Sequence, residues 1–78
     1  MKVEILTPEW NKAFESPAVF LPGVLGQFEV LEGHAPIIST LTPGDVIWRT
    51  PQGEQETLAV KGGLVRVGRG EMQICAEV

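Results

Sequence analysis

Short apolar segments recur along the whole chain, and Pro, Gly and small polar residues separate each one from the next. Most segments run for four to seven residues, which suits strands, because helices need about ten or more. They are rich in the β-branched and aromatic residues that favour strands. The expected strands are Val3–Leu6, Ala13–Glu15, Ala18–Leu21, Gln27–Leu31, Pro36–Leu41, Asp45–Thr50, Glu56–Lys61, Leu64–Val67 and Glu71–Val78.

Several of these segments alternate between apolar and polar residues. Phe28 and Val30 alternate with polar neighbours, and Met72, Ile74 and Ala76 do so in the last segment. Successive side chains of a strand point to opposite faces. Each such strand is therefore expected to have one buried and one solvated face, which is the pattern of antiparallel sheets.

The chain offers one helix candidate, Pro8–Ser16, which is short and has few strong helix formers. We expect a turn and a short strand there instead, so no helix is available to connect parallel strands. The pattern predicts an all-β fold, a flattened antiparallel β-sandwich or barrel of about 8–10 short strands. With 78 residues and neither a linker nor a repeat, residues 1–78 are expected to form a single domain.

Composition and charge narrow the possible functions. The 44% hydrophobic and 21% charged residues indicate a globular chain, and a net charge of −4 argues against nucleic-acid binding. Lys61, Arg66 and Arg69 are expected on a solvated sheet surface. No apolar stretch approaches the roughly 20 residues of a membrane-spanning helix, and the apolar segment near the start is too short for a signal peptide. Cys75 is the only cysteine, which excludes an internal disulfide.

His34, the only histidine, lies in the sequence GHAP and is the one residue that invites an enzymatic interpretation. Ser16 and Ser39 are the only serines, and neither lies in the G-x-S-x-G context of a nucleophile. One histidine and one distant cysteine do not form a zinc site. The glycines of GVLG and GRG fit hairpin turns better than a phosphate loop, because no helix follows them. We therefore expect no catalytic, metal-binding or cofactor-binding residue.

The remaining functional signal lies at the surface. Val24 and Leu25 stand between two glycines at an expected loop tip, where they either contact a partner or plug one end of the sandwich. Trp10 and Trp48 are candidates for core or interface positions. The alternation of Trp48 with Val46 favours the core for Trp48.

Four stretches, in order along the chain, carry a resemblance to a known family. They are VEILTPE, LPGVLGQFEVLEGHAPIISTLTPG, LAVKGGLVRV and EMQICAE, and together they resemble the N-terminal β-sandwich domain of the epsilon subunit of F-type ATP synthases. Glu29 departs from the family pattern, in which many members carry a small residue. The family commonly continues into a C-terminal helical hairpin. No helical segment follows the last strand here, so the resemblance is to a short form in which neither inhibition nor nucleotide binding by a hairpin is expected.

The resemblance implies a non-catalytic rotor subunit of the central stalk, which links the gamma subunit to the c-ring and helps couple proton-driven rotation to ATP synthesis. It also implies a peripheral position on the cytoplasmic face of the bacterial inner membrane, within the ATP synthase complex, without membrane insertion or a cofactor. It maps two contacts onto this chain: Thr7, His34 and Ser39 for the gamma subunit, and Gly26, Gln27 and Phe28 for the c-ring.

Two other functions stay open on the residues alone. A free-standing small β-barrel could bind a ligand or peptide, although no polar cluster lies among aromatic residues as a ligand pocket requires. An enzyme would have to use His34, for which the chain offers no evident nucleophile or metal partner.

Overall fold

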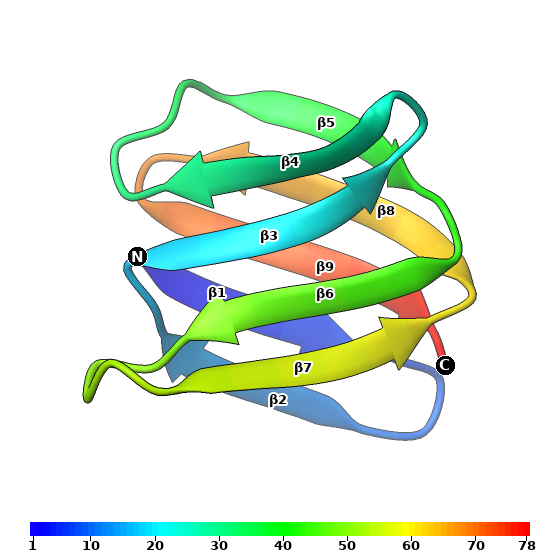
Figure 1. The fold of residues 1–78 in the computed structure, drawn as a ribbon, viewed down its shortest axis with the longest axis horizontal. Coiled ribbons are helices and arrows are strands. Elements are labelled where there is room, and N and C mark those ends of the chain that lie inside the picture. Colours follow the sequence, from blue (N-terminus) through cyan, green and yellow to red (C-terminus); the bar gives the residue numbers. More distant parts are fainter.

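The computed structural model describes residues 1–78 and contains nine strands and no helix, which confirms the all-β prediction. The strands lie in two layers, with β4, β3, β6 and β7 in front and β5, β8, β9, β1 and β2 behind (Figure 1). No element is a helix long and apolar enough to cross a membrane. The strands are β1 Lys2–Leu6, β2 Asn11–Glu15, β3 Ala18–Gly23, β4 Gly26–Leu31, β5 Ile37–Leu41, β6 Gly44–Arg49, β7 Gln55–Val60, β8 Gly62–Gly68 and β9 Glu71–Glu77.

Sheet pairing is antiparallel except at one place. The first and last strands, β1 and β9, lie side by side and pair in parallel, which the antiparallel expectation did not include. No hairpin turn joins these two strands, so turn geometry does not fix their relative direction. The two layers are connected where Gly23 of β3 pairs with Leu41 of β5. Beside this pair, the Thr42 amide donates to the Pro22 carbonyl oxygen at 3.0 Å as the chain leaves the rear layer for β6.

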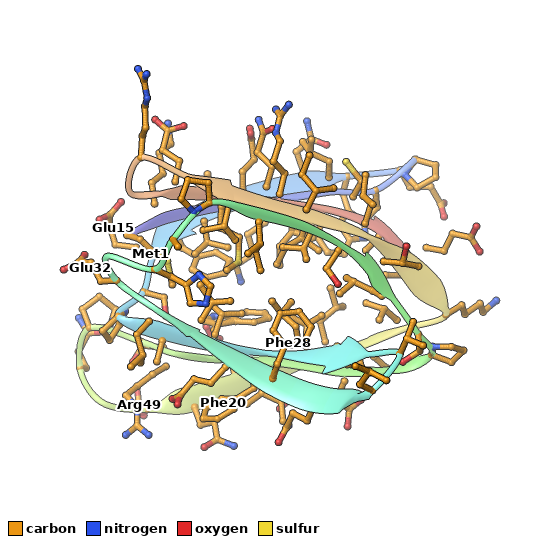
Figure 2. The ribbon with its side chains drawn as sticks, turned by 90° about the horizontal axis from the view of Figure 1, so that it is seen from above. Met1, Glu15, Phe20, Phe28, Glu32 and Arg49 are labelled. Atoms are coloured by element: carbon orange, nitrogen blue, oxygen red, sulfur yellow. The ribbon has the colours of Figure 1, made fainter.

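The core lies between the two layers, where apolar side chains from alternate strand positions meet (Figure 2). Trp48 is only 5% exposed, which confirms its predicted core position. Phe14, Phe28, Ile37 and Leu58 are partly buried against this core. Its buried members are Met1, Val3, Ile5, Val19, Leu21, Val30, Leu41, Val46, Trp48, Val60, Val65, Val67, Met72, Ile74 and Ala76.

Aromatic side chains close the side of the sandwich between β2 and β7, the two strands at the ends of the sheet. The rings of Phe14 and Trp48 stack with their centroids 4.7 Å apart, and the Lys12 ammonium lies 5.6 Å from the Trp48 ring. The indole N–H of Trp48 donates to Glu56 at 3.1 Å. These contacts hold β2 in place. The presence of this strand at Asn11–Glu15 confirms the expectation of a turn and a strand, rather than a helix, within Pro8–Ser16.

Gly63 marks a close approach of the β8 backbone to β9. Its φ of 151° is one that residues with a side chain rarely adopt. A Cβ atom at this position would lie 2.1 Å from the carbonyl oxygen of Cys75. The second glycine of the KGG sequence is therefore required by packing between the two strands.

Replacing Gly63 with alanine is expected to lower the free energy of unfolding by about 3 kcal/mol or more, because backbone strain and steric overlap add. Gly68→Ala on the same strand is the matched control, since a Cβ there meets no atom within 4 Å. We expect that control to be neutral or stabilising by up to about 1 kcal/mol. Urea denaturation followed by circular dichroism measures both variants, and equal midpoints would contradict the assignment.

Candidate interaction surfaces

The turn between β3 and β4 carries an apolar tip. Val24 is 73% exposed and Leu25 is fully exposed, so neither plugs the end of the sandwich. The alternative interpretation, contact with a partner, stays a prediction. Exposed large apolar side chains at the tip of a two-stranded hairpin are available to a partner without any change in the core.

The residues predicted to contact the c-ring follow this tip at the start of β4, and they differ in orientation. Gly26 and Gln27 line a shallow hollow of about 300 Å³, together with Thr42 and Asp45. Phe28 points the other way and packs against the core. At this end of the molecule, Gln27 and the two tip residues are thus accessible, whereas Phe28 supports the hairpin from inside.

The three residues predicted to contact the gamma subunit do not gather at one point. Thr7 follows β1 at one end of the rear layer, whereas His34 lies between β4 and β5 at the other end (Figure 1). Ser39 is in the middle of β5 and pairs with Val65, which is fully buried. Directly paired residues share a sheet face, so the Ser39 side chain lies on the inner face and is half-buried. A single partner surface would need to extend along the rear layer to reach both ends.

The Thr7 hydroxyl is occupied within its own turn. It donates to the Trp10 carbonyl oxygen at 2.8 Å and accepts the amide of Trp10 at 3.0 Å. This local hydrogen bonding is typical of threonine in turns. Thr7 therefore shapes the turn between β1 and β2.

The loop that carries His34 is anchored at one end of the molecule. The α-ammonium group of Met1 lies 2.5 Å from a carboxylate oxygen of Glu32 and also donates to the Ser16 carbonyl oxygen at 2.9 Å (Figure 2). The His34 amide donates to the Leu31 carbonyl oxygen at 3.0 Å. The hydrogen bond from the Met1 ammonium, together with its positive charge, lowers the pKa of Glu32 below its ordinary value of 4.5.

His34 itself is exposed, and the hydrogen bond of its ring is local. Its Nδ1 atom is 2.6 Å from the carbonyl oxygen of the adjacent Ala35, a distance that suits an N–H donor in that tautomer. No group of three or more His, Cys, Asp or Glu side chains is arranged to hold a metal ion. His34 is thus an exposed loop residue, and its hydrogen bonds are to the backbone of nearby residues.

The outer face of the rear layer is a further surface, which the sequence did not reveal. Ile38 is 70% exposed and Leu64 is 46% exposed, and both line one hollow with Arg66, Gln73 and Cys75. The segment PIISTL contains two adjacent isoleucines, so its alternation did not show which one faces solvent. The partly apolar character of this face became visible only from the strand register.

The fold is a small β-sandwich that exposes apolar side chains at the β3–β4 turn and on the outer face of the rear layer. The model of the family "ATP synthase, Delta/Epsilon chain, beta-sandwich domain" matches residues 1–78, and the chain belongs to this family. The ATP synthase epsilon chain of Nitrobacter winogradskyi is 38% identical over 77 residues, which are 96% of this chain and 56% of the relative. The epsilon chain of Gloeothece citriformis is 36% identical over 77 residues, 95% and 54% of the two chains. The chain thus spans about half the length of these curated relatives.

Solved structures show the same fold at lower identity. A chain of the Euglena gracilis mitochondrial ATP synthase, in a structure of OSCP, F1 and c-ring, superposes with a TM-score of 0.89 at 21% identity. The superposition covers 95% of this chain and 48% of that one. A chain of the Tetrahymena thermophila mitochondrial ATP synthase, from its central stalk and c-ring, gives a TM-score of 0.86 at 16% identity. It covers 100% of this chain and 63% of that one, and both likenesses concern the fold alone.

Replacing Glu32 with glutamine is expected to lower stability near neutral pH and to remove part of its pH dependence. Because the folded-state pKa of Glu32 is depressed, its contribution is present above about 4.5 and is lost as the pH falls through the folded-state value. The difference in Tm between wild type and Glu32→Gln should therefore be present at about pH 6 and shrink as the pH falls below about 4.5. Glu29→Gln, an exposed carboxylate of β4 without an ion pair, is the control. A Tm difference that is the same at neutral and at acidic pH would contradict a stabilising ion pair between Met1 and Glu32.

Proposed function

We propose that this chain acts as a non-catalytic subunit of the central stalk of an F-type ATP synthase, where it links the gamma subunit to the c-ring. The observation that carries the proposal is the family match over residues 1–78, supported by epsilon-chain relatives of 38% and 36% identity. In this role the domain, taken as one unit, transmits torque between ring rotation and ATP synthesis. The complex would hold it peripherally at the cytoplasmic face of a bacterial inner membrane.

Two separate surfaces suit a protein that joins two partners. The c-ring contact is proposed at the turn between β3 and β4, with Gly26, Gln27 and Phe28 next to the exposed tip. The gamma contact is proposed on the outer face of the rear layer, which Thr7 and His34 flank at its two ends. Ser39 would be reached only from the β5 edge, because its side chain lies on the inner face.

The dimensions of the domain are compatible with simultaneous contacts. Its principal extents are 26 × 24 × 18 Å, so one partner surface can span the rear layer from the Thr7 turn to the His34 loop. The close-packed interior resists deformation, which is what a torque-transmitting element needs. Binding of one partner leaves the other surface uncovered, because the tip and the outer face belong to different parts of the fold.

Co-purification with the gamma subunit tests the proposal most directly. Ile38→Glu removes an apolar contact from the proposed gamma surface and should weaken association by about tenfold or more, because the introduced carboxylate, which lies opposite Arg66, would have to be desolvated on binding. The control is Thr57→Glu, an exposed residue of β7 in the other layer, which should bind gamma like wild type. Absence of any association of the wild-type chain under conditions in which the synthase assembles would overturn the proposed function.

The tip between β3 and β4 is tested by a second variant. Val24→Ser combined with Leu25→Ser should leave the stability within about 0.5 kcal/mol, since both side chains are exposed. It should reduce recovery of the c-ring with the assembled stalk while gamma binding persists. Gln52→Ser in the exposed turn between β6 and β7 is the matched loop control. Equal c-ring recovery with the wild type, the double serine variant and Gln52→Ser would argue against a contact at the tip.

A further inference from the structure

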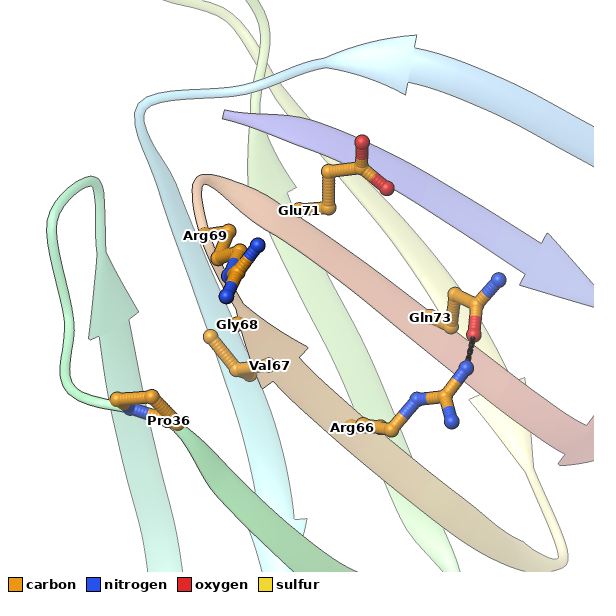
Figure 3. A pocket seen from close by; sticks show the side chains of 7 residues that line it. All are labelled: Pro36, Arg66, Val67, Gly68, Arg69, Glu71 and Gln73. Atoms are coloured by element: carbon orange, nitrogen blue, oxygen red, sulfur yellow. Dashed lines mark hydrogen bonds between the residues drawn. The ribbon is translucent and has the colours of Figure 1, made fainter.

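A positively charged pocket lies on the outer face of the rear layer. It has a volume of about 440 Å³, and its polar lining comes from Arg66, Arg69, Glu71 and Gln73 (Figure 3). Pro36, from the loop after His34, closes one side of it. Two guanidinium groups and one carboxylate give this pocket a net positive charge in a chain whose overall charge is −4.

Arg66 is held by a hydrogen bond to a neutral side chain, which in turn binds a carboxylate two strands away. Its guanidinium donates to the Gln73 amide oxygen, and the Gln73 amide nitrogen donates to Glu4 at 3.2 Å. This row crosses three adjacent strands, β8, β9 and β1, because Arg66 pairs with Gln73 and Gln73 pairs with Glu4. The single ion pair of the structure joins Met1 and Glu32, so the charge of Arg66 has no carboxylate within 4 Å. The guanidinium is held in place but not neutralised.

Arg69 occupies a turn position that arginine rarely takes. Its φ is 51°, and that of Gly70 is 75°, so both central residues of the turn between β8 and β9 have positive φ. Hairpins of this type favour Asn-Gly, because positive φ is costly for other residues with a side chain. The turn therefore places a second unpaired guanidinium at the pocket at some cost in backbone strain.

Apolar surface adjoins this charge on the other side of Arg66. The same arginine lines one neighbouring hollow with Ile38 and Leu64 and another with Pro36 and Ile37. Arg66 is therefore shared by a polar pocket and two apolar ones. An arginine next to apolar contacts is typical of the residues that dominate binding energy at protein interfaces.

We propose that this pocket binds a carboxylate side chain of the gamma subunit, which pairs with Arg66 and Arg69 while a neighbouring apolar side chain packs on Ile38 and Leu64. The proposal rests on the proposed function and names the chemistry of that contact. A guanidinium donates two parallel hydrogen bonds to a carboxylate. Glu71 lines the same pocket and would repel the greater charge of a phosphate, which favours a single carboxylate as the occupant.

The experiment measures the affinity of the purified gamma subunit for the wild-type chain and three variants. Arg66→Gln should weaken binding by about 10- to 100-fold, and Arg66→Glu should weaken it further. Arg49→Gln removes the same charge from the opposite layer, where Arg49 points away from the interior (Figure 2), and should change affinity by no more than about twofold. Raising the salt concentration should weaken wild-type binding more steeply than Arg66→Gln binding.

Each outcome decides the proposal. Equal affinity of wild type and Arg66→Gln, with gamma still bound, overturns the carboxylate contact and leaves the proposed function standing. Absence of gamma binding by the wild-type chain overturns both. Saturable binding of inorganic phosphate that Arg66→Gln abolishes, with unchanged gamma affinity, also overturns the proposal in favour of a small-anion site.

A folding control separates lost binding from lost structure. Arg66→Gln should keep the wild-type Tm, because Arg66 is exposed and belongs to no ion pair. If that variant unfolds, Arg66→Lys provides the test, since lysine keeps the charge but lacks the planar fork. Its affinity should lie below that of the wild type, and wild-type affinity would overturn the proposed bidentate contact.

Discussion

Packing of the two sheet layers through one layer of alternating side chains is the constraint on which the rest of the structure depends. A strand has only two faces, so each residue that enters the core places its neighbours on the outside. Val65 and Val67 are buried, and therefore Leu64 and Arg66 face solvent. The composition of the exposed faces thus follows from the same register that builds the core.

The ends of the sandwich are organised by different interactions from its faces. At one end, the Met1 ammonium joins the Ser16 carbonyl and the Glu32 carboxylate, so three chain segments meet at a single charged group. At the other end, the apolar tip of Val24 and Leu25 extends free of the core. A change at the tip is therefore expected to leave the packing between the layers intact, because Val24 and Leu25 are exposed.

Much of the fold could be predicted from local pattern, and the surfaces could be predicted only in part. The alternation of Met72, Ile74 and Ala76 correctly assigned the faces of β9, since the polar residues between them cannot be buried without partners. Adjacent Ile37 and Ile38 gave no such information, because either could enter the core. Their assignment required the pairing of β5 with β8, which is a contact between segments distant in sequence.

By itself, the amino-acid sequence determined the strands, the turns and most of the residues that form the core. These features depend on the types of a few consecutive residues and on the spacing of the apolar ones among them. Only the tertiary structure decided that β1 and β9 pair in parallel. It also decided that Thr7 and His34 lie at opposite ends of one layer and that Arg66 is held by Gln73 on its outer face. All three features depend on which strands, distant in sequence, become neighbours in the sheet. That pairing is set by the packing of the whole core between the two layers, and no single residue or short segment determines it.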